Sequence, residues 1–227
     1  MYSDDYAYVS TLVPISGAAE IELIQVRRCI TSICTQTFAH LDICVIVSGI
    51  SAELKQMLSD LITLDDRIRV ITHDEDGYAA LLNRGLAEAT GDWISIVEPT
   101  DYIDPTMYSD MLKLASEFHQ RLDIVKTPWF YVFNGCDPMK RTARPCEIEG
   151  KHKTTLKATS VSERRFLMQG PASIWSALYH KDFLAEHAVS FQNMASPQEV
   201  DEQFRRDTLE RATQIVYLDE PYYYHHV

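Results

Sequence analysis

The sequence has few positive charges. It carries 21 Lys and Arg residues against 33 Asp and Glu residues over 227 positions, so its formal net charge at pH 7 is -12. Proteins that bind nucleic acid obtain much of their affinity for the phosphate backbone from clustered Lys and Arg side chains. This balance excludes nucleic acid as an expected partner.

Long apolar stretches are also absent. No run approaches the roughly 18 consecutive apolar residues that a membrane-spanning helix needs. The chain starts Met-Tyr-Ser-Asp-Asp, which lacks the basic and apolar segments of a secretory signal peptide. We therefore expect a soluble, cytoplasmic protein. Its 46% of hydrophobic residues are still sufficient for a proper core.

The cysteines include no C-x-x-C pair, which argues against a zinc site. There are five, at positions 29, 34, 44, 136 and 146. Cys44 lies in an apolar run at 43–47, where a free cysteine usually packs as a small buried hydrophobe. We expect reduced structural thiols, as is usual in the cytoplasm.

The first half of the chain alternates short apolar runs with amphipathic segments. The pattern predicts strands at 8–14, 41–47, 67–71, 93–97 and 122–126, and helices at 20–34, 52–62, 77–89 and 105–119. Such alternation with short connections indicates right-handed βαβ units and a mainly parallel sheet. The strands are continuously apolar, which is typical of sheets covered on both faces.

The regular pattern weakens after Trp129. The segment 134–153 is polar and predicts a long loop over the sheet. Beyond it, the pattern predicts helices at 161–168, 181–187 and 197–212, and strands at 174–179 and 214–218. We expect a smaller, mixed C-terminal part within one α/β domain, because a length near 230 fits a single large domain.

Ligands of open parallel sheets bind beyond the carboxyl ends of the strands. The informative segments are therefore 14–20, 47–51, 72–77 and 98–104, which follow the first four predicted strands. The glycine spacing in the 77–85 segment is that of neither a P-loop nor a G-x-G-x-x-G motif. Gly77 and Gly85 are thus expected to serve the backbone more than to contact phosphate.

Six segments, in order along the chain, carry a family resemblance. They are VSTLVP at 9–14, SICTQTF at 32–38, the glycine and N-R-G residues of 77–85, GDWISIVEPTDYIDP at 91–105, ALYHKDFLAEH at 177–187 and LDEPYYY at 218–224. Together they resemble the inverting nucleotide-sugar glycosyltransferases of family two, which have the GT-A fold and build bacterial surface and capsular polysaccharides.

The resemblance implies a Rossmann-like GT-A α/β fold over residues 1–227, with a nucleotide-binding half at 1–128 and an acceptor-side half at 129–227. It implies transfer of a sugar, with inversion, from a nucleotide-diphosphate sugar to a glycan or lipid-linked acceptor. It places the reaction in the cytoplasm, at the inner face of the membrane. Partner enzymes or the membrane would be contacted through regions outside this chain.

The resemblance also assigns candidate site residues. It implies substrate-binding roles for Pro14, Gly49, Gly77, Asn83, Glu98 and Asp101. Glu98 and Asp101 would also bind the Mg²⁺ or Mn²⁺ ion that bridges the donor's diphosphate. Asp201 would be the general base that takes the proton from the acceptor hydroxyl.

Several family acids are replaced in this chain. The departures are Val47, Ser48, Thr100 and Val200, and Leu82 stands where the family often has arginine. An alternative function is therefore a catalytically inactive glycosyltransferase-like domain that works in binding or scaffolding, since a fold does not guarantee a function. A nucleotidyltransferase would need a basic glycine-rich loop, which 15–19 does not supply.

Each candidate also has a purely structural interpretation. Glu98 and Asp101 could cap the helix that follows them. Asp201 lies in the predicted first turn of a helix, where an acid is favourable in any case. The pair His225 and His226 is expected to belong to a solvated terminus more than to a metal site.

Overall fold

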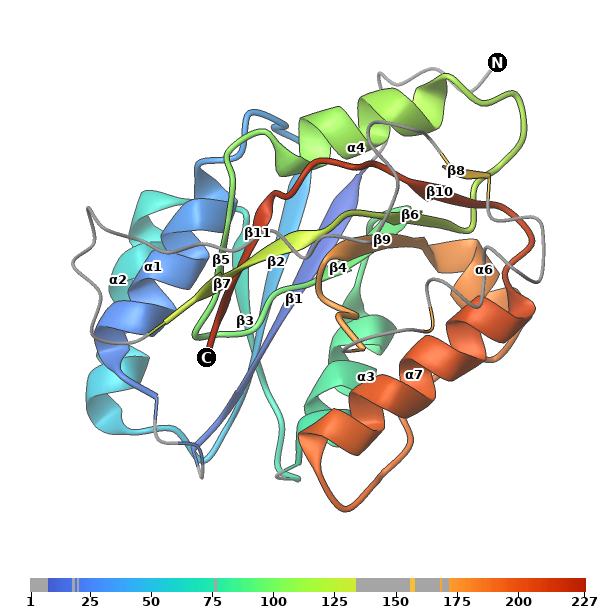
Figure 1. The fold of residues 1–227 in the computed structure, drawn as a ribbon. Helices are drawn as coiled ribbons and strands as arrows, with labels where there is room; N and C mark the ends of the chain where they lie inside the picture. Colours follow the sequence, from blue (N-terminus) through green and yellow to red (C-terminus); the bar gives the residue numbers. More distant parts are fainter. Residues whose placement is uncertain are drawn as a thin grey trace.

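The computed structural model describes residues 8–17, 19, 21–75, 77–133, 156–157, 168 and 172–227 (Figure 1). The loop predicted at 134–153 lies outside the described residues, as does the helix predicted at 161–168 apart from Met168. Within the described part, none of the helices is both long enough and apolar enough to cross a membrane.

An eight-stranded sheet forms the centre of the fold, in the order β3-β2-β1-β4-β9-β6-β10-β8. Its strands are β1 (Val9–Ser16), β2 (Leu41–Ser48), β3 (Ile68–Thr72), β4 (Trp93–Ile96), β6 (Ile124–Lys126), β8 (Leu156–Lys157), β9 (Ala177–His180) and β10 (Ile215–Tyr217). Strands β1 to β4 are parallel to one another, whereas β9 is antiparallel to β4 and β6. The prediction of a mainly parallel α/β sheet with a mixed C-terminal part is confirmed.

The helices follow the strands with which they alternate in sequence. They are α1 (Leu23–Cys34), α2 (Ala52–Leu64), α3 (Tyr78–Glu88), α4 (Met107–Ser116), α6 (Lys181–Glu186) and α7 (Pro197–Arg211). Figure 1 shows α1 beside α2 and α3 beside α7, and the helices of each pair are in contact. Helix α3 packs on β1 and β2, which brings its first residues to the carboxyl ends of these strands.

Strand β1 does not end at Pro14 as predicted but continues to Ser16. The O atom of Leu12 accepts from the N–H of Val97 on the β4 side, and Pro14, two residues later, faces the same neighbour. Strand β4 ends at Ile96, so the missing N–H of proline leaves no ladder partner unpaired. Pro14 is buried inside the strand.

A second sheet of three strands was not predicted. It has the order β5-β11-β7, formed by β5 (Tyr102–Ile103), β11 (Tyr223–His226) and β7 (Trp129–Val132). Strand β11 is central, antiparallel to β5 and parallel to β7. The end of the described chain is therefore built into the fold beside the turn that follows β4.

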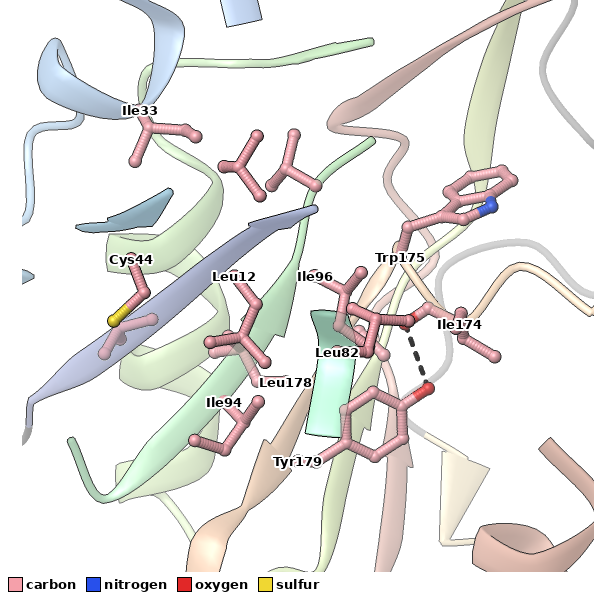
Figure 2. Close-up of a cluster of buried hydrophobic side chains, with 14 of the residues drawn as sticks. Leu12, Ile33, Cys44, Leu82, Ile94, Ile96, Ile174, Trp175, Leu178 and Tyr179 are labelled. Carbon is pink, nitrogen blue, oxygen red and sulfur yellow. Dashed lines mark hydrogen bonds between the residues drawn. The ribbon is translucent and has the colours of Figure 1, made fainter. Parts of the chain in front are cut away.

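Buried apolar side chains from both halves of the chain form one core. Figure 2 shows Leu12 of β1 and Ile96 of β4 near Leu82 of α3. Leu82 is fully buried, so the position where the family often has arginine serves packing here. Burial of each such side chain contributes about 1.5–3 kcal/mol. Cys44 is also fully buried, as predicted.

A buried polar network fixes the other end of the sheet. Asp42 of β2 accepts from Ser10 Oγ at 2.7 Å and from Arg69 Nε at 2.7 Å. It also accepts from the N–H of Thr90 at 3.0 Å. Burial acts to raise the pKa of Asp42, but the hydrogen bonds from Arg69, Ser10 and Thr90 outweigh it and hold the pKa well below its usual range. The network ties β1, β2, β3 and the turn after α3 together.

We predict that Asp42→Asn destabilises the protein by about 2–4 kcal/mol at pH 7, because it removes a buried charge from its donors. A depressed pKa gives stability that is present above the ordinary carboxyl pKa and is lost in acid. The loss should therefore shrink as the pH falls below about 4. Urea unfolding at several pH values measures it, with the exposed Asp66→Asn as control. Equal losses in both variants would contradict the prediction.

Candidate functional site

The loops that follow β1 and β2 meet at the carboxyl edge of the sheet. The N–H of Gly17 donates to the O atom of Ser48 at 2.7 Å, and a Cβ atom on Gly17 would lie 2.0 Å from the O atom of Gly49. Gly49 has a φ of +61°, which favours glycine. Val47 and Ser48 are 3% and 5% exposed. Gly17 is therefore required by close backbone packing and Gly49 is favoured by its backbone conformation, while the two replaced family positions are buried.

Gly77 and Asn83 lie on α3, beside a surface pocket of about 450 Å³ that both residues line together with His73 and Phe191. Gly77 precedes the helix with a φ of +141°. The side-chain amide of Asn83 donates to the O atom of Phe191 at 2.8 Å and accepts from its N–H at 2.9 Å. Asn83 thus fixes the chain that leads into α7, and its role in substrate binding stays a prediction.

Glu98 follows β4 and faces the first residue of α3. The hydroxyl of Tyr78 donates to Glu98 Oε1 at 2.5 Å. Burial raises the pKa of Glu98, and the nearby charge of Asp201 raises it further. Burial likewise raises the pKa of Tyr78. Glu98 is therefore a partly buried carboxyl that holds its proton more tightly than an exposed one.

Asp201 joins this pair from α7. Ser196 caps the helix by accepting from the N–H of Glu199, so Asp201 lies beyond the first turn, not within it as predicted. Burial raises the pKa of Asp201, while hydrogen bonding from Tyr78 acts in the opposite direction. Its Oδ1 atom is buried and has no hydrogen-bond partner among the described residues. An unpaired buried oxygen of this kind is available to accept a proton.

Asp101 points away from this group, toward β11. It is fully buried and accepts from the hydroxyl of Tyr223 at 2.8 Å, from Nδ1 of His225 at 2.9 Å and from the N–H of His226 at 2.8 Å. The side chain therefore fixes the small sheet. Its predicted roles in binding metal and substrate are not favoured by this geometry.

The prediction of a solvated terminus at His225 is wrong. The imidazole stacks on Trp175 with ring centroids 4.5 Å apart, and its side chain is 27% exposed. Trp175 also stacks on Tyr223, whose hydroxyl accepts from the N–H of Glu98 at 3.0 Å. The sequence reasoning missed Tyr78, Tyr223 and His225. The run of three tyrosines and two histidines at 222–226 was the only signal for two of them.

A divalent cation needs hard oxygen ligands, and the residues predicted to supply them do not converge. Glu98 is bonded to Tyr78, Asp101 is turned toward β11, and Thr100 offers a neutral hydroxyl. Among the described residues, no three or more His, Cys, Asp or Glu side chains are grouped so that they could hold a metal ion. The donor set therefore does not fit the Mg²⁺ or Mn²⁺ ion that the resemblance implies.

We predict that Glu98→Gln stabilises the protein relative to wild type at pH 8 and not at pH 5. A carboxyl with a raised pKa contributes stability that is present below its unfolded pKa and is lost as the pH rises. The glutamine side chain does not titrate and can still accept from Tyr78. The free energy of unfolding of Glu98→Gln should therefore exceed that of wild type by roughly 1–3 kcal/mol at pH 8.

Thermal unfolding of both proteins across this pH range measures the difference. The matched control is Glu117→Gln, which replaces an exposed acid. A stability difference between Glu98→Gln and wild type that stays constant with pH would show that Glu98 is not the buried titrating group.

Solved structures share this architecture. S. aureus TarS 1-349 in complex with UDP superposes with a TM-score of 0.75 at 19% identity, over 97% of this chain and 60% of that one. The complex of the same protein with UDP-GlcNAc gives a TM-score of 0.77 at 18% identity, over 97% and 58%. At this level of identity the likeness establishes the GT-A fold.

Sequence relatives point the same way. The chain is 24% identical to the uncharacterized glycosyltransferase EpsJ of Bacillus subtilis (strain 168), over 95% of the chain and 60% of that relative. It is 22% identical to the uncharacterized glycosyltransferase YibD of Escherichia coli (strain K12), over 81% and 51%. The chain thus spans little more than half the length of these relatives. Residues 22–175 match the model of Glycosyl transferase family 2, and because this match covers more than half of the sequence, the chain belongs to that family.

Proposed function

We propose that the chain transfers a sugar from a nucleotide-diphosphate sugar to a hydroxyl of a glycan or lipid-linked acceptor, with inversion at the anomeric carbon. The observation that carries the proposal is the unpaired, buried Oδ1 atom of Asp201 beside Glu98 and Tyr78. This group lies at the carboxyl edge of the sheet, where open α/β folds bind their ligands.

In the proposed reaction, Asp201 accepts the proton of the acceptor hydroxyl as its oxygen attacks the anomeric carbon. The bond from that carbon to the diphosphate breaks, and the nucleoside diphosphate leaves with the bonding electron pair. A raised pKa suits this role, because a general base works best when its pKa is near the working pH. Tyr78 donates its hydroxyl proton to Glu98, and burial raises the pKa of Tyr78 while the charges of Glu98 and Asp201 raise it further.

The nature of the donor and the acceptor is inferred from the relatives. The complexes of TarS with UDP and UDP-GlcNAc make uridine diphosphate sugars the first donors to test. We propose that the acceptor belongs to surface polysaccharide synthesis and that the reaction takes place in the cytoplasm at the inner face of the membrane. Contacts with the membrane or with a partner enzyme would involve regions outside this chain.

We predict that Asp201→Asn lowers the rate of sugar transfer by about 10²–10⁴-fold, the usual contribution of a general base. The affinity for UDP should stay within about twofold of wild type, because the variant keeps the size of the side chain. Release of UDP from UDP-GlcNAc, with and without added acceptors, measures the rate, and calorimetric titration measures UDP binding.

The matched control is Glu210→Gln, an exposed acid near the other end of α7. Unchanged turnover in Asp201→Asn would refute the assignment of the base. A wild-type protein that binds nucleotide but turns over none of the UDP- and GDP-sugars would instead favour the binding or scaffolding function. Two observations favour this binding or scaffolding function: Thr100 replaces a family acid, and the side chain of Asp101 faces inward.

A further inference from the structure

A guanidinium group supports the turn that follows β4 at the position of the replaced acid. Arg28 of α1 donates through Nη2 to the O atom of Thr100 at 2.7 Å. Its Cζ atom lies 4.5 Å from the ring centroid of Tyr102. The neighbouring Cys29 contacts the O atom of Glu98 through Sγ at 3.4 Å. Helix α1 thus backs the whole turn and brings a fixed positive charge to it.

This positive charge has no carboxylate partner in the described part of the chain, where none of the ion pairs includes Arg28. The Nε atom of Arg28 is buried and has no hydrogen-bond acceptor among the described residues. An unsatisfied buried donor of this kind is costly unless a ligand completes it. The Arg28 guanidinium therefore keeps one donor that a ligand oxygen can accept from.

His226 of β11 adds to the same region. Tyr102, which lies against the guanidinium of Arg28, stacks on Tyr224 with ring centroids 4.5 Å apart. His226 is two residues further along β11 and so faces the same side of the strand as Tyr224. The main-chain N–H of His226 is already bonded to Asp101, so the ring is the part free to meet a ligand. Arginine and an imidazole N–H are both suited to phosphate oxygens.

We propose that Arg28, with His226 beside it, binds the diphosphate of the nucleotide sugar and takes the place of the divalent cation that the resemblance implies. The inference rests on the proposed function, since it concerns the donor of that reaction. It accounts for one departure from the family: Thr100 replaces a carboxylate that would hold a cation, and the main-chain O atom of this residue accepts from the cationic side chain of Arg28.

The test is calorimetric titration of the full chain with UDP and with uridine, in EDTA and in Mn²⁺. We expect UDP to bind equally well in both buffers. Arg28→Met should weaken UDP binding by about tenfold or more, the usual effect of losing a hydrogen bond to a charged group. Uridine has no phosphate, so its affinity should not change. A merely structural role of Arg28 would weaken both ligands together.

Arg27→Met is the matched control, because Arg27 is the exposed neighbour on the same helix, and it should leave both affinities unchanged. Arg28→Lys serves if Arg28→Met does not fold, and should weaken UDP selectively because lysine lacks the planar fork. UDP binding that requires Mn²⁺, or equal weakening of UDP and uridine, would overturn the inference while nucleotide binding stands. Failure of UDP, GDP and other nucleoside diphosphates to bind in either buffer would refute the proposed function and this inference with it.

Discussion

The buried carboxylate of Asp101 holds together the parts of the site that are most distant in sequence. It lies in the turn after β4, and its partners Tyr223, His225 and His226 lie more than 120 residues later in the chain. A carboxylate can be removed from water at low cost only when donors surround it. The need to satisfy this one side chain therefore specifies where β11 must lie, and with it the position of the small sheet.

From this contact the remaining geometry follows in steps. The hydroxyl of Tyr223 also accepts a hydrogen bond from the main-chain N–H of Glu98. The side chain of Glu98 in turn accepts one from Tyr78, at the start of α3. Asn83, one turn further along α3, holds the segment before α7, and α7 carries Asp201. The acids of the site are thus positioned by the packing and hydrogen bonds between elements, and burial raises the pKa of Glu98 and of Asp201. Their chemistry depends on this surrounding structure more than on their own spacing in the sequence.

The parallel part of the central sheet could be predicted from the sequence because β1 to β4 are apolar and separated by strongly periodic helices. The small sheet could not, because its strands do not alternate with helices in this way, and Tyr102–Ile103 and Trp129–Val132 pair only with a strand far along the chain. The acidic turn was found from its motif, but the motif does not say that Asp101 faces inward. Leu82 shows the same limit, since only packing reveals that its side chain belongs to the core.

The place of β11 in the middle of the small sheet has a consequence for synthesis on the ribosome. Strands β1 to β4 and their helices are made first and pair with neighbours that have already emerged. The carboxylate at 101 must then wait for residues 223–226, because its hydrogen-bond partners follow it by more than 120 residues. Pairing across such a separation is slow relative to local contacts. A nascent chain can therefore hold β1 to β4 while the candidate site is still incomplete, so the site takes its final geometry only after residues 223–226 have joined the small sheet.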